Sequence, residues 1–267
     1  MSMLRTLLAP LGPRAATFHR RLVSSDRYTR GLIIILPGID GCTTVSDNIA
    51  RGLDAAGLNM AVELIDWRGS PRWSPLHLTT RSQHLQQAVR IAGRIVGYAA
   101  ENPGMPVHLI GHSAGAAMVL FVLRELGSVC QIDSAVLLSP AISRGFEIRS
   151  LLNVTRRGIW NFCSIADLPA LGIGTLLFGT LDRRHSVSAG FLGFHQSPIS
   201  ADQEARALHQ IRYSWRMAHR WNFGGHFGNT NAAFVRHYVA PLMQSSNRST
   251  EFDSSSKVNR MLIRSER

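Results

Sequence analysis

Residues 107–115 read VHLIGHSAG, and this stretch decides how the chain is interpreted. The mainly apolar run VHLI is typical of a buried strand, and the five residues GHSAG match the pattern Gly-x-Ser-x-Gly. A sharp turn at this point would lift the hydroxyl of Ser113 above the end of the strand, and the flanking glycines would leave space for the chain. The alternative interpretation is an ordinary turn in which Ser113 caps the following helix.

Strand-like and helix-like segments alternate on both sides of this motif. Such alternation predicts an α/β fold, with a mostly parallel, doubly wound sheet and helices on both faces. Ligands bind such sheets outside the carboxyl ends of the strands. The predicted strands are 31–37, 61–67, 107–110, 134–142, 158–165 and, more weakly, 208–215. The predicted helices are 46–57, with Ser46 or Asp47 as its N-cap, 82–100, 114–126 and 232–243.

A serine nucleophile needs a base, and the base needs an acid that orients it. With a serine in this type of turn, the partners follow in the order acid, then histidine. Asp167 comes directly after a predicted strand, at its carboxyl end, and is the favoured acid. Asp182 is the alternative, although we interpret it as a loop carboxylate paired with a neighbouring arginine. Asp133 precedes its strand, which would put it at the opposite edge of the sheet.

His226 is the favoured base among the histidines that follow Asp167. It stands in the glycine-flanked stretch FGGHFGN, ahead of the last predicted helix, and the glycines would let the backbone bring its ring over Ser113. His112, beside the serine, is interpreted as a residue that packs under the turn, with substrate contact as a secondary expectation.

The backbone N–H groups of Ala114 and Ile39 are the predicted donors to an oxyanion. Ala114 follows the serine, and Ile39 lies in LPGIDG (36–41), after the first core strand. Gly38 and Asp40 are neighbours that could replace Ile39, and an ordinary Pro-Gly turn is the alternative interpretation. Gly38, Asp40, His112 and Trp67 are the candidate substrate-binding residues. Trp67 opens the loop WRGSPRWSP (67–75), which is expected either to wall the pocket or to be a surface loop.

Together these residues resemble the α/β-hydrolase superfamily, specifically small serine esterases and lipases, over roughly residues 31–243. LPGIDG, GHSAG, LFGTLDRRH and GGHFG also look like an uncharacterised bacterial-type branch of it. The resemblance implies a serine hydrolase that cleaves carboxylic esters or thioesters through an acyl-enzyme. An acyltransferase with the same three residues and a non-catalytic binding protein are the alternatives. Many members carry His-Gly at the oxyanion loop, where this chain has Pro37 and Gly38.

The formal net charge is +12, and 29 basic residues outnumber 17 acidic ones. Because the arginines are scattered and no nucleic-acid motif appears, we expect a small-molecule ester or acyl substrate and no nucleic acid. No cofactor or metal is expected. The three cysteines are widely spaced and without a Cys-x-x-Cys pair, and they are interpreted as buried free thiols in a reducing compartment. The sequence leaves the oligomeric state undetermined.

We expect residues 1–30 to be a flexible or leader-like basic segment, 31–243 the hydrolase domain, and 244–267 a disordered polar tail. The favoured location is the cytoplasm, and the alternative is membrane association or export through the basic N-terminus. The short gap between Ser113 and the acid argues against a large cap domain. The uncharged stretch 168–181 is expected to be either a lid or a buried crossover.

Overall fold

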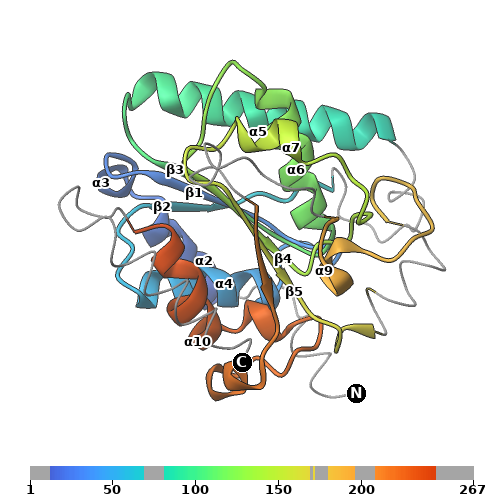
Figure 1. Cartoon of the computed structure of the whole chain (residues 1–267). Coiled ribbons are helices and arrows are strands. Elements are labelled where there is room, and N and C mark those ends of the chain that lie inside the picture. The colour runs from blue at the N-terminus through green and yellow to red at the C-terminus, as the bar shows by residue number, and fades with distance from the viewer. Residues whose placement is uncertain (1–12, 69–80, 169–170, 172–179, 196–207, 245–267) are drawn as a thin grey trace.

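A six-stranded, all-parallel sheet forms the centre of the computed structural model, which describes residues 13–68, 81–168, 171, 180–195 and 208–244 (Figure 1). The strand order is β2-β1-β3-β4-β5-β6. The predicted doubly wound α/β fold is therefore confirmed, including the weakly patterned last strand. The strands are β1 (Leu32–Leu36), β2 (Ala61–Leu64), β3 (Val107–His112), β4 (Ser134–Leu138), β5 (Ile159–Cys163) and β6 (Leu208–Arg212).

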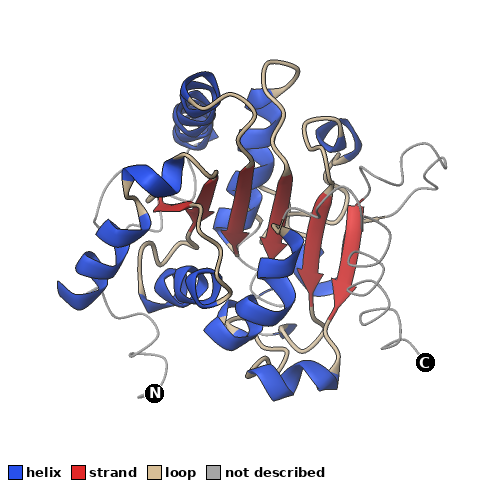
Figure 2. Ribbon diagram, turned by 90° about the vertical axis from the view of Figure 1, so that its left-hand side faces the viewer, coloured by secondary structure: helices blue, strands red, loops and turns tan. Residues whose placement is uncertain are grey.

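Helices cover both faces of this sheet, as Figure 2 shows. Alternate strand residues point to opposite faces, so Ile34 packs with one helix layer and Ile33 with the other. The first layer contains α5 (Arg81–Glu101), α6 (Ala114–Leu126), α7 (Arg149–Leu152) and α9 (Ala189–Leu192). The second contains α2 (Pro13–Leu22), α4 (Thr44–Ala55) and the closing segment α10 (Ala232–Phe234), η6 (Val235–Val239) and η7 (Ala240–Leu242). Shorter pieces are α3 (Ser25–Tyr28), η4 (Trp215–Arg220) and η5 (Gly228–Thr230).

The N-terminal part of the chain differs from the sequence expectation. Residues 13–28, predicted to belong to a flexible or leader-like segment, form α2 and α3, so the flexible interpretation is wrong for them. Leu22 is fully buried against the second helix layer, and Arg27 forms an ion pair of 2.7 Å with Asp54 on α4. These contacts tie the basic segment to the sheet. Residues 1–12 and the tail 245–267 lie outside the described residues, so the domain boundaries stay predictions.

Two helix ends also differ from the prediction. The N-cap of α4 is Thr43, whose side chain accepts from the backbone of Val45, while Ser46 reaches back to the Thr43 backbone. Ser46 is thus the partner in a capping box and not the cap. The closing helix, predicted to be continuous, changes from α-helical to π-helical to 3-10 turns before Met243, with Pro241 in the last piece. No helix within the described residues is long and apolar enough to cross a bilayer.

Candidate active site

Ser113 occupies a strained turn between β3 and α6. Its backbone angles are φ 54° and ψ −120°, a sparsely populated conformation with positive φ that costs a residue with a side chain of order 1–3 kcal/mol. The glycines of the motif are required by space. A Cβ atom on Gly115 would lie 2.1 Å from the carbonyl oxygen of Leu36, and one on Gly111 would lie 2.4 Å from Cα of Ala116. The turn therefore packs directly against the end of β1.

The hydroxyl of Ser113 does not cap α6, which removes the capping interpretation. Instead Ser113 Oγ lies 3.0 Å from Nε2 of His226, 113 residues further along the chain. Nδ1 of the same ring lies 2.6 Å from a carboxylate oxygen of Asp167. The three predicted side chains thus form one hydrogen-bonded chain at the carboxyl edge of the sheet.

Asp167 is almost completely buried, with 1% of its surface exposed. Burial raises the pKa of its carboxyl group, while hydrogen bonds from His226, the Ser139 hydroxyl and the Leu171 backbone favour the ionised form. Ser139 follows β4 with φ 48°, and its hydroxyl accepts a 2.8 Å bond from the Asn229 amide. The hydroxyl thus links Asp167 to Asn229, and neither Ser139 nor Asn229 was predicted.

The two other candidate acids lie in different surroundings. Asp182 accepts hydrogen bonds from Ser143 and Thr180, and its separation from the Arg184 guanidinium is 3.9 Å. It is a loop carboxylate, although hydroxyls bind it more closely than the predicted arginine does. Asp133 accepts from the Val107 backbone at the amino end of β3, the edge opposite Ser113, as predicted.

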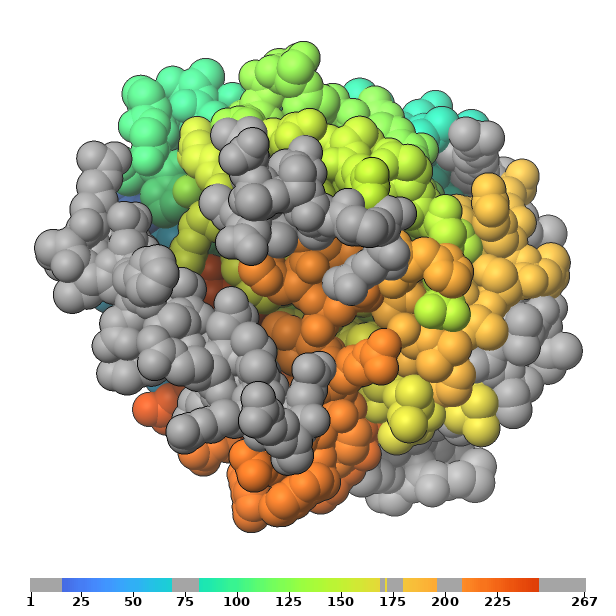
Figure 3. Space-filling model, in the orientation of Figure 1, coloured from blue at the N-terminus to red at the C-terminus, as the bar shows by residue number. Residues whose placement is uncertain are grey.

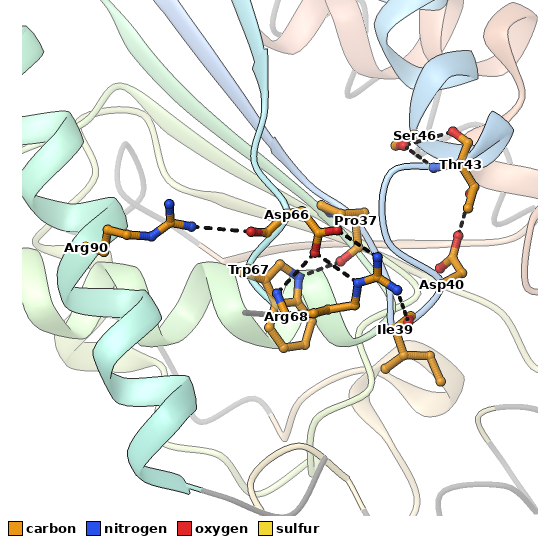
Figure 4. Close-up of polar contacts among 9 residues, drawn as sticks. All are labelled: Pro37, Ile39, Asp40, Thr43, Ser46, Asp66, Trp67, Arg68 and Arg90. Atoms are coloured by element: carbon orange, nitrogen blue, oxygen red, sulfur yellow. Dashed lines mark hydrogen bonds and ion pairs between the residues drawn. The ribbon is translucent and has the colours of Figure 1, made fainter. Parts of the chain in front are cut away.

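The loop after β1 lies close to the serine, and hydrogen bonds to the backbone carbonyls of the loop hold its shape. A Cβ atom on Gly38 would lie 3.5 Å from Cβ of Ser113. The carbonyl of Gly38 accepts a 3.0 Å hydrogen bond from the Gly41 backbone. The carbonyl of Pro37 accepts from the Trp67 indole at 2.7 Å, and that of Ile39 from the Arg68 guanidinium at 3.3 Å (Figure 4).

Because the described residues contain no cis peptide bond, the N–H of each peptide points opposite its carbonyl. Bonds to the carbonyls of Pro37, Gly38 and Ile39 therefore fix the orientation of three consecutive N–H groups. These are the groups of Gly38, Ile39 and Asp40, the three candidate donors of this loop. A loop held in this way needs little reorganisation when a negative charge develops.

Arg68 is itself held in place by neighbouring residues. Its guanidinium makes two hydrogen bonds to the Asp66 carboxylate, at 2.9 and 2.7 Å, which leaves its third nitrogen for Ile39. These bonds raise the pKa of Arg68. The backbone carbonyl of Asp66 accepts from Arg90 on α5 at 3.3 Å, and Figure 4 shows this series reaching from α5 to the loop.

Two of the candidate substrate-binding residues, Trp67 and His112, are buried in structural contacts, whereas the prediction for Asp40 is not tested. Trp67 is 3% exposed and anchors Pro37, so it supports the loop and does not wall an open pocket. His112 is 1% exposed, and its Nε2 lies 3.0 Å from the backbone oxygen of His226. Burial and the neighbouring His226 lower the pKa of His112 to about 3. Asp40 accepts a hydrogen bond from Thr43. His112 and Trp67 are too buried to contact a substrate.

A cavity of about 460 Å³ lies beside α5 and α6, and its lining includes neither Ser113 nor Asp167 nor His226. Its lining includes Phe121, Phe146, Arg124 and Leu181. Leu181 ends the uncharged stretch 168–181, most of which lies outside the described residues, as do residues 69–75 of the predicted aromatic loop. The choice between a lid and a crossover therefore stays open.

The three cysteines form no disulfide with one another. Cys163 is buried, whereas Cys42 and Cys130 are only partly buried. The expectation that all three are buried is wrong for two of them. Burial raises the pKa of the Cys42 and Cys163 thiols to about 11, which disfavours the reactive thiolates. Within the described ranges, no group of three or more His, Cys, Asp or Glu side chains could hold a metal ion.

The chain is similar to several solved structures. It is 13% identical to Aspergillus fumigatus lipase B, with a TM-score of 0.48. The match covers 90% of this chain and 59% of the lipase. For a predicted CIB-like hydrolase from Thermoplasma acidophilum, the identity is 16%, the TM-score 0.41 and the coverages 80% and 86%. For an uncharacterized protein from Bacillus cereus ATCC 10987, the identity is 14% and the TM-score 0.40. The match covers 71% of this chain and 54% of that protein, so the chain spans about half of its length.

At these identities the likenesses concern the fold alone. None of the curated proteins compared with the chain matches it. The sequence profile of the Hydrolase_4 family, described as serine aminopeptidase, S33, matches residues 27–166, which are more than half of the chain. That range contains the loop after β1, the turn at Ser113 and the strand that precedes Asp167. The chain therefore belongs to this serine aminopeptidase S33 family and has the α/β-hydrolase fold.

Proposed function

We propose that this protein hydrolyses carboxylic esters or thioesters, with Ser113 as nucleophile, His226 as base and Asp167 as the acid that orients His226. The observation that carries the proposal is the pair of hydrogen bonds through one imidazole ring. Nε2 of His226 is 3.0 Å from Ser113 Oγ, and Nδ1 is 2.6 Å from Asp167. One nitrogen of the ring thus meets the nucleophile, while the other is fixed by a buried carboxylate.

The proposed reaction has two steps. Ser113 Oγ attacks the carbonyl carbon of the ester while His226 Nε2 takes the hydroxyl proton, and the carbonyl oxygen becomes an oxyanion. The N–H groups of Ala114 and Ile39 stabilise that oxyanion. The intermediate then collapses, the carbon–oxygen bond to the alcohol breaks, and His226 returns the proton to the leaving alcohol. Water repeats the sequence on the acyl-enzyme and releases the acid and free Ser113.

Labelling with a fluorophosphonate tests the activated serine. We expect the purified protein to be labelled, Ser113→Ala to lose the label, and Asp167→Asn and His226→Ala to be labelled far more slowly. A folded wild-type protein that is not labelled would remove the proposal. A panel of p-nitrophenyl esters, a thioester and an aminoacyl p-nitroanilide then separates ester, thioester and peptide bond cleavage.

Acyl transfer by the same three residues stays the alternative, since it differs only in whether water or an alcohol attacks the acyl-enzyme. Turnover of an ester in the presence of a second alcohol distinguishes the two. Hydrolysis predicts the free acid as the main product, whereas a transferase would release a new ester.

A further inference from the structure

Five large apolar side chains are exposed in the segments that lead to Asp167 and His226 or follow Asp167. Trp215, Trp221 and Phe223, in and after η4, expose 70%, 65% and 62% of their surfaces. Ile165 and Leu168, in the loop after β5, expose 70% and 49%. These five side chains are named the loop surface. Soluble proteins rarely gather exposed aromatic side chains without a partner that covers them.

The loop surface belongs to the two loops that carry Asp167 and His226. Ile165 and Leu168 lie on either side of Asp167 in the sequence, and Phe223 precedes His226 by three residues. The loops touch, because a Cβ atom on Gly224 would lie 3.0 Å from the Ala166 side chain. Figure 3 shows the orange segment that includes 215–223 exposed on the lower part of the molecule. Whatever covers the loop surface would therefore lie on the two loops that carry Asp167 and His226.

Positive charge accompanies these apolar side chains. Arg212, Arg216 and Arg220 are exposed in and just before η4, and the guanidinium of Arg216 lies 5.9 Å from the Trp215 ring centre. The sequence contains no Asp or Glu between residues 205 and 250. The segment thus combines exposed aromatic rings with exposed arginines and has no acidic residue of its own.

We propose that the loop surface docks on an anionic lipid bilayer, so that the active site faces an ester carried by a lipid. Tryptophan and phenylalanine insert favourably at the boundary between lipid headgroups and acyl chains, and arginines beside them are attracted to anionic headgroups. The part of the inference that concerns the ester rests on the proposed function, whereas the docking itself does not.

A second copy of the chain fits this surface less well. A two-fold interface places the same patch on both sides, so Arg216 and Arg220 of one copy would approach those of the other. Like charges that meet in a dehydrated interface are unfavourable. An anionic bilayer instead supplies both the apolar environment for the rings and the opposite charge for the guanidinium groups.

Co-sedimentation of the full chain with vesicles tests the docking. We expect strong binding to vesicles of phosphatidylcholine with 30% phosphatidylglycerol, with that proportion chosen as a roughly typical anionic content, and weak binding to phosphatidylcholine alone. Trp215→Ser/Trp221→Ser and Arg216→Gln/Arg220→Gln should each weaken binding about tenfold or more. Matched controls are Val129→Ser, an exposed apolar residue elsewhere, and Arg149→Gln/Arg156→Gln, with the same change in charge. Both should bind as the wild type does.

Ser113→Ala should also bind as the wild type does, because docking does not need the reaction. A protein that binds vesicles but hydrolyses no ester would overturn the proposed function and the lipid-ester part of this inference, and would leave the docking supported. Wild-type protein that ignores anionic vesicles, or loop-surface variants that bind as tightly as the controls, would overturn the docking. A dimer in solution that the tryptophan variant dissociates would overturn it in favour of a second copy.

Discussion

The indole nitrogen of Trp67 donates a 2.7 Å hydrogen bond to the carbonyl of Pro37, and this contact joins the end of β2 to the loop beside Ser113. Trp67 is buried, so water cannot replace the bond if the indole N–H is lost. The contact makes a residue outside the hydrogen-bonded chain of Ser113, His226 and Asp167 part of the support for the loop that carries the proposed donor Ile39.

Trp67→Phe keeps an aromatic ring but removes this bond. We expect kcat for a soluble ester to fall about tenfold with KM changed less than about twofold, because the bond holds the Gly38 peptide beside the proposed donor Ile39 and a loosened donor loop is felt mainly in the transition state. Arg68→Gln should behave in the same way, since it removes the bond to Ile39. Arg51→Gln, on α4 and paired with Asp47, is the matched control. Equal kcat values for all four proteins would contradict the role of these anchors.

Gly115→Ala should prevent the turn at Ser113 from forming correctly. The added Cβ would lie 2.1 and 2.2 Å from the backbone oxygens of Leu36 and Pro37, which cannot move aside independently of β1. We expect a loss of about 3 kcal/mol or more in the free energy of unfolding. Gly93→Ala, in an open part of α5 with no atom within 4 Å, should instead gain about 1 kcal/mol. Urea denaturation of both variants checks the contrast.

Asp167→Asn and Asp182→Asn should separate the two candidate acids. Asparagine at 167 cannot stabilise a protonated His226, so we expect kcat to fall by about 10⁴. Asp182 binds Ser143 and Thr180, so its replacement should lower stability by about 1–2 kcal/mol and leave kcat within about threefold of the wild type. Steady-state kinetics with a p-nitrophenyl ester provides the measurement, and a reversal of the two results would make Asp182 the acid.

Stability should decrease when the pH is lowered from 7 to 5, in part because of His108. Burial, with a smaller contribution from the charge of Arg157, lowers its pKa to about 3, whereas in the unfolded chain it is about 6.5. Between these values the unfolded state binds a proton that the folded state does not, so stability falls as the pH falls. At pH 5 this group costs roughly 2 kcal/mol.

His108→Gln can keep the hydrogen bond to Ser134 but removes the titration. The decrease in unfolding free energy between pH 7 and pH 5 should therefore shrink by roughly 2 kcal/mol. An unaltered decrease in His108→Gln would mean that His108 is not buried in its neutral form.

The sequence predicted the parts of the site that depend on position along the chain. Ser113, Asp167 and His226 each follow a strand, and the carboxyl ends of parallel strands meet at one edge, so their order sufficed to bring them together. Their catalytic roles stay predictions. Ser139 and Asn229 escaped notice because a serine after a strand and an asparagine in a loop are common, and only the folded chain shows that they meet.

The prediction and the structure also differ where several residues suited one role. Thr43, Ser46 and Asp47 can all cap a helix, and local sequence does not say which one adopts extended backbone angles. Trp67 follows a strand and could equally have faced the pocket or the loop after β1. For residues 13–28, the many arginines suggested a flexible segment. That composition concealed Leu22, which is buried, and Arg27, whose partner Asp54 is distant in sequence.

The parallel order of the sheet also has a consequence for how the protein folds. Ser113 follows β3 and His226 follows β6, 113 residues later, with β4 and β5 between them in the sheet. Every neighbouring pair of strands is parallel and joined by a long connection, and such pairings form slowly during folding. No single segment therefore brings Ser113 and His226 together, and labelling of Ser113 by the fluorophosphonate, if the proposed function is right, would report that β3 to β6 have assembled.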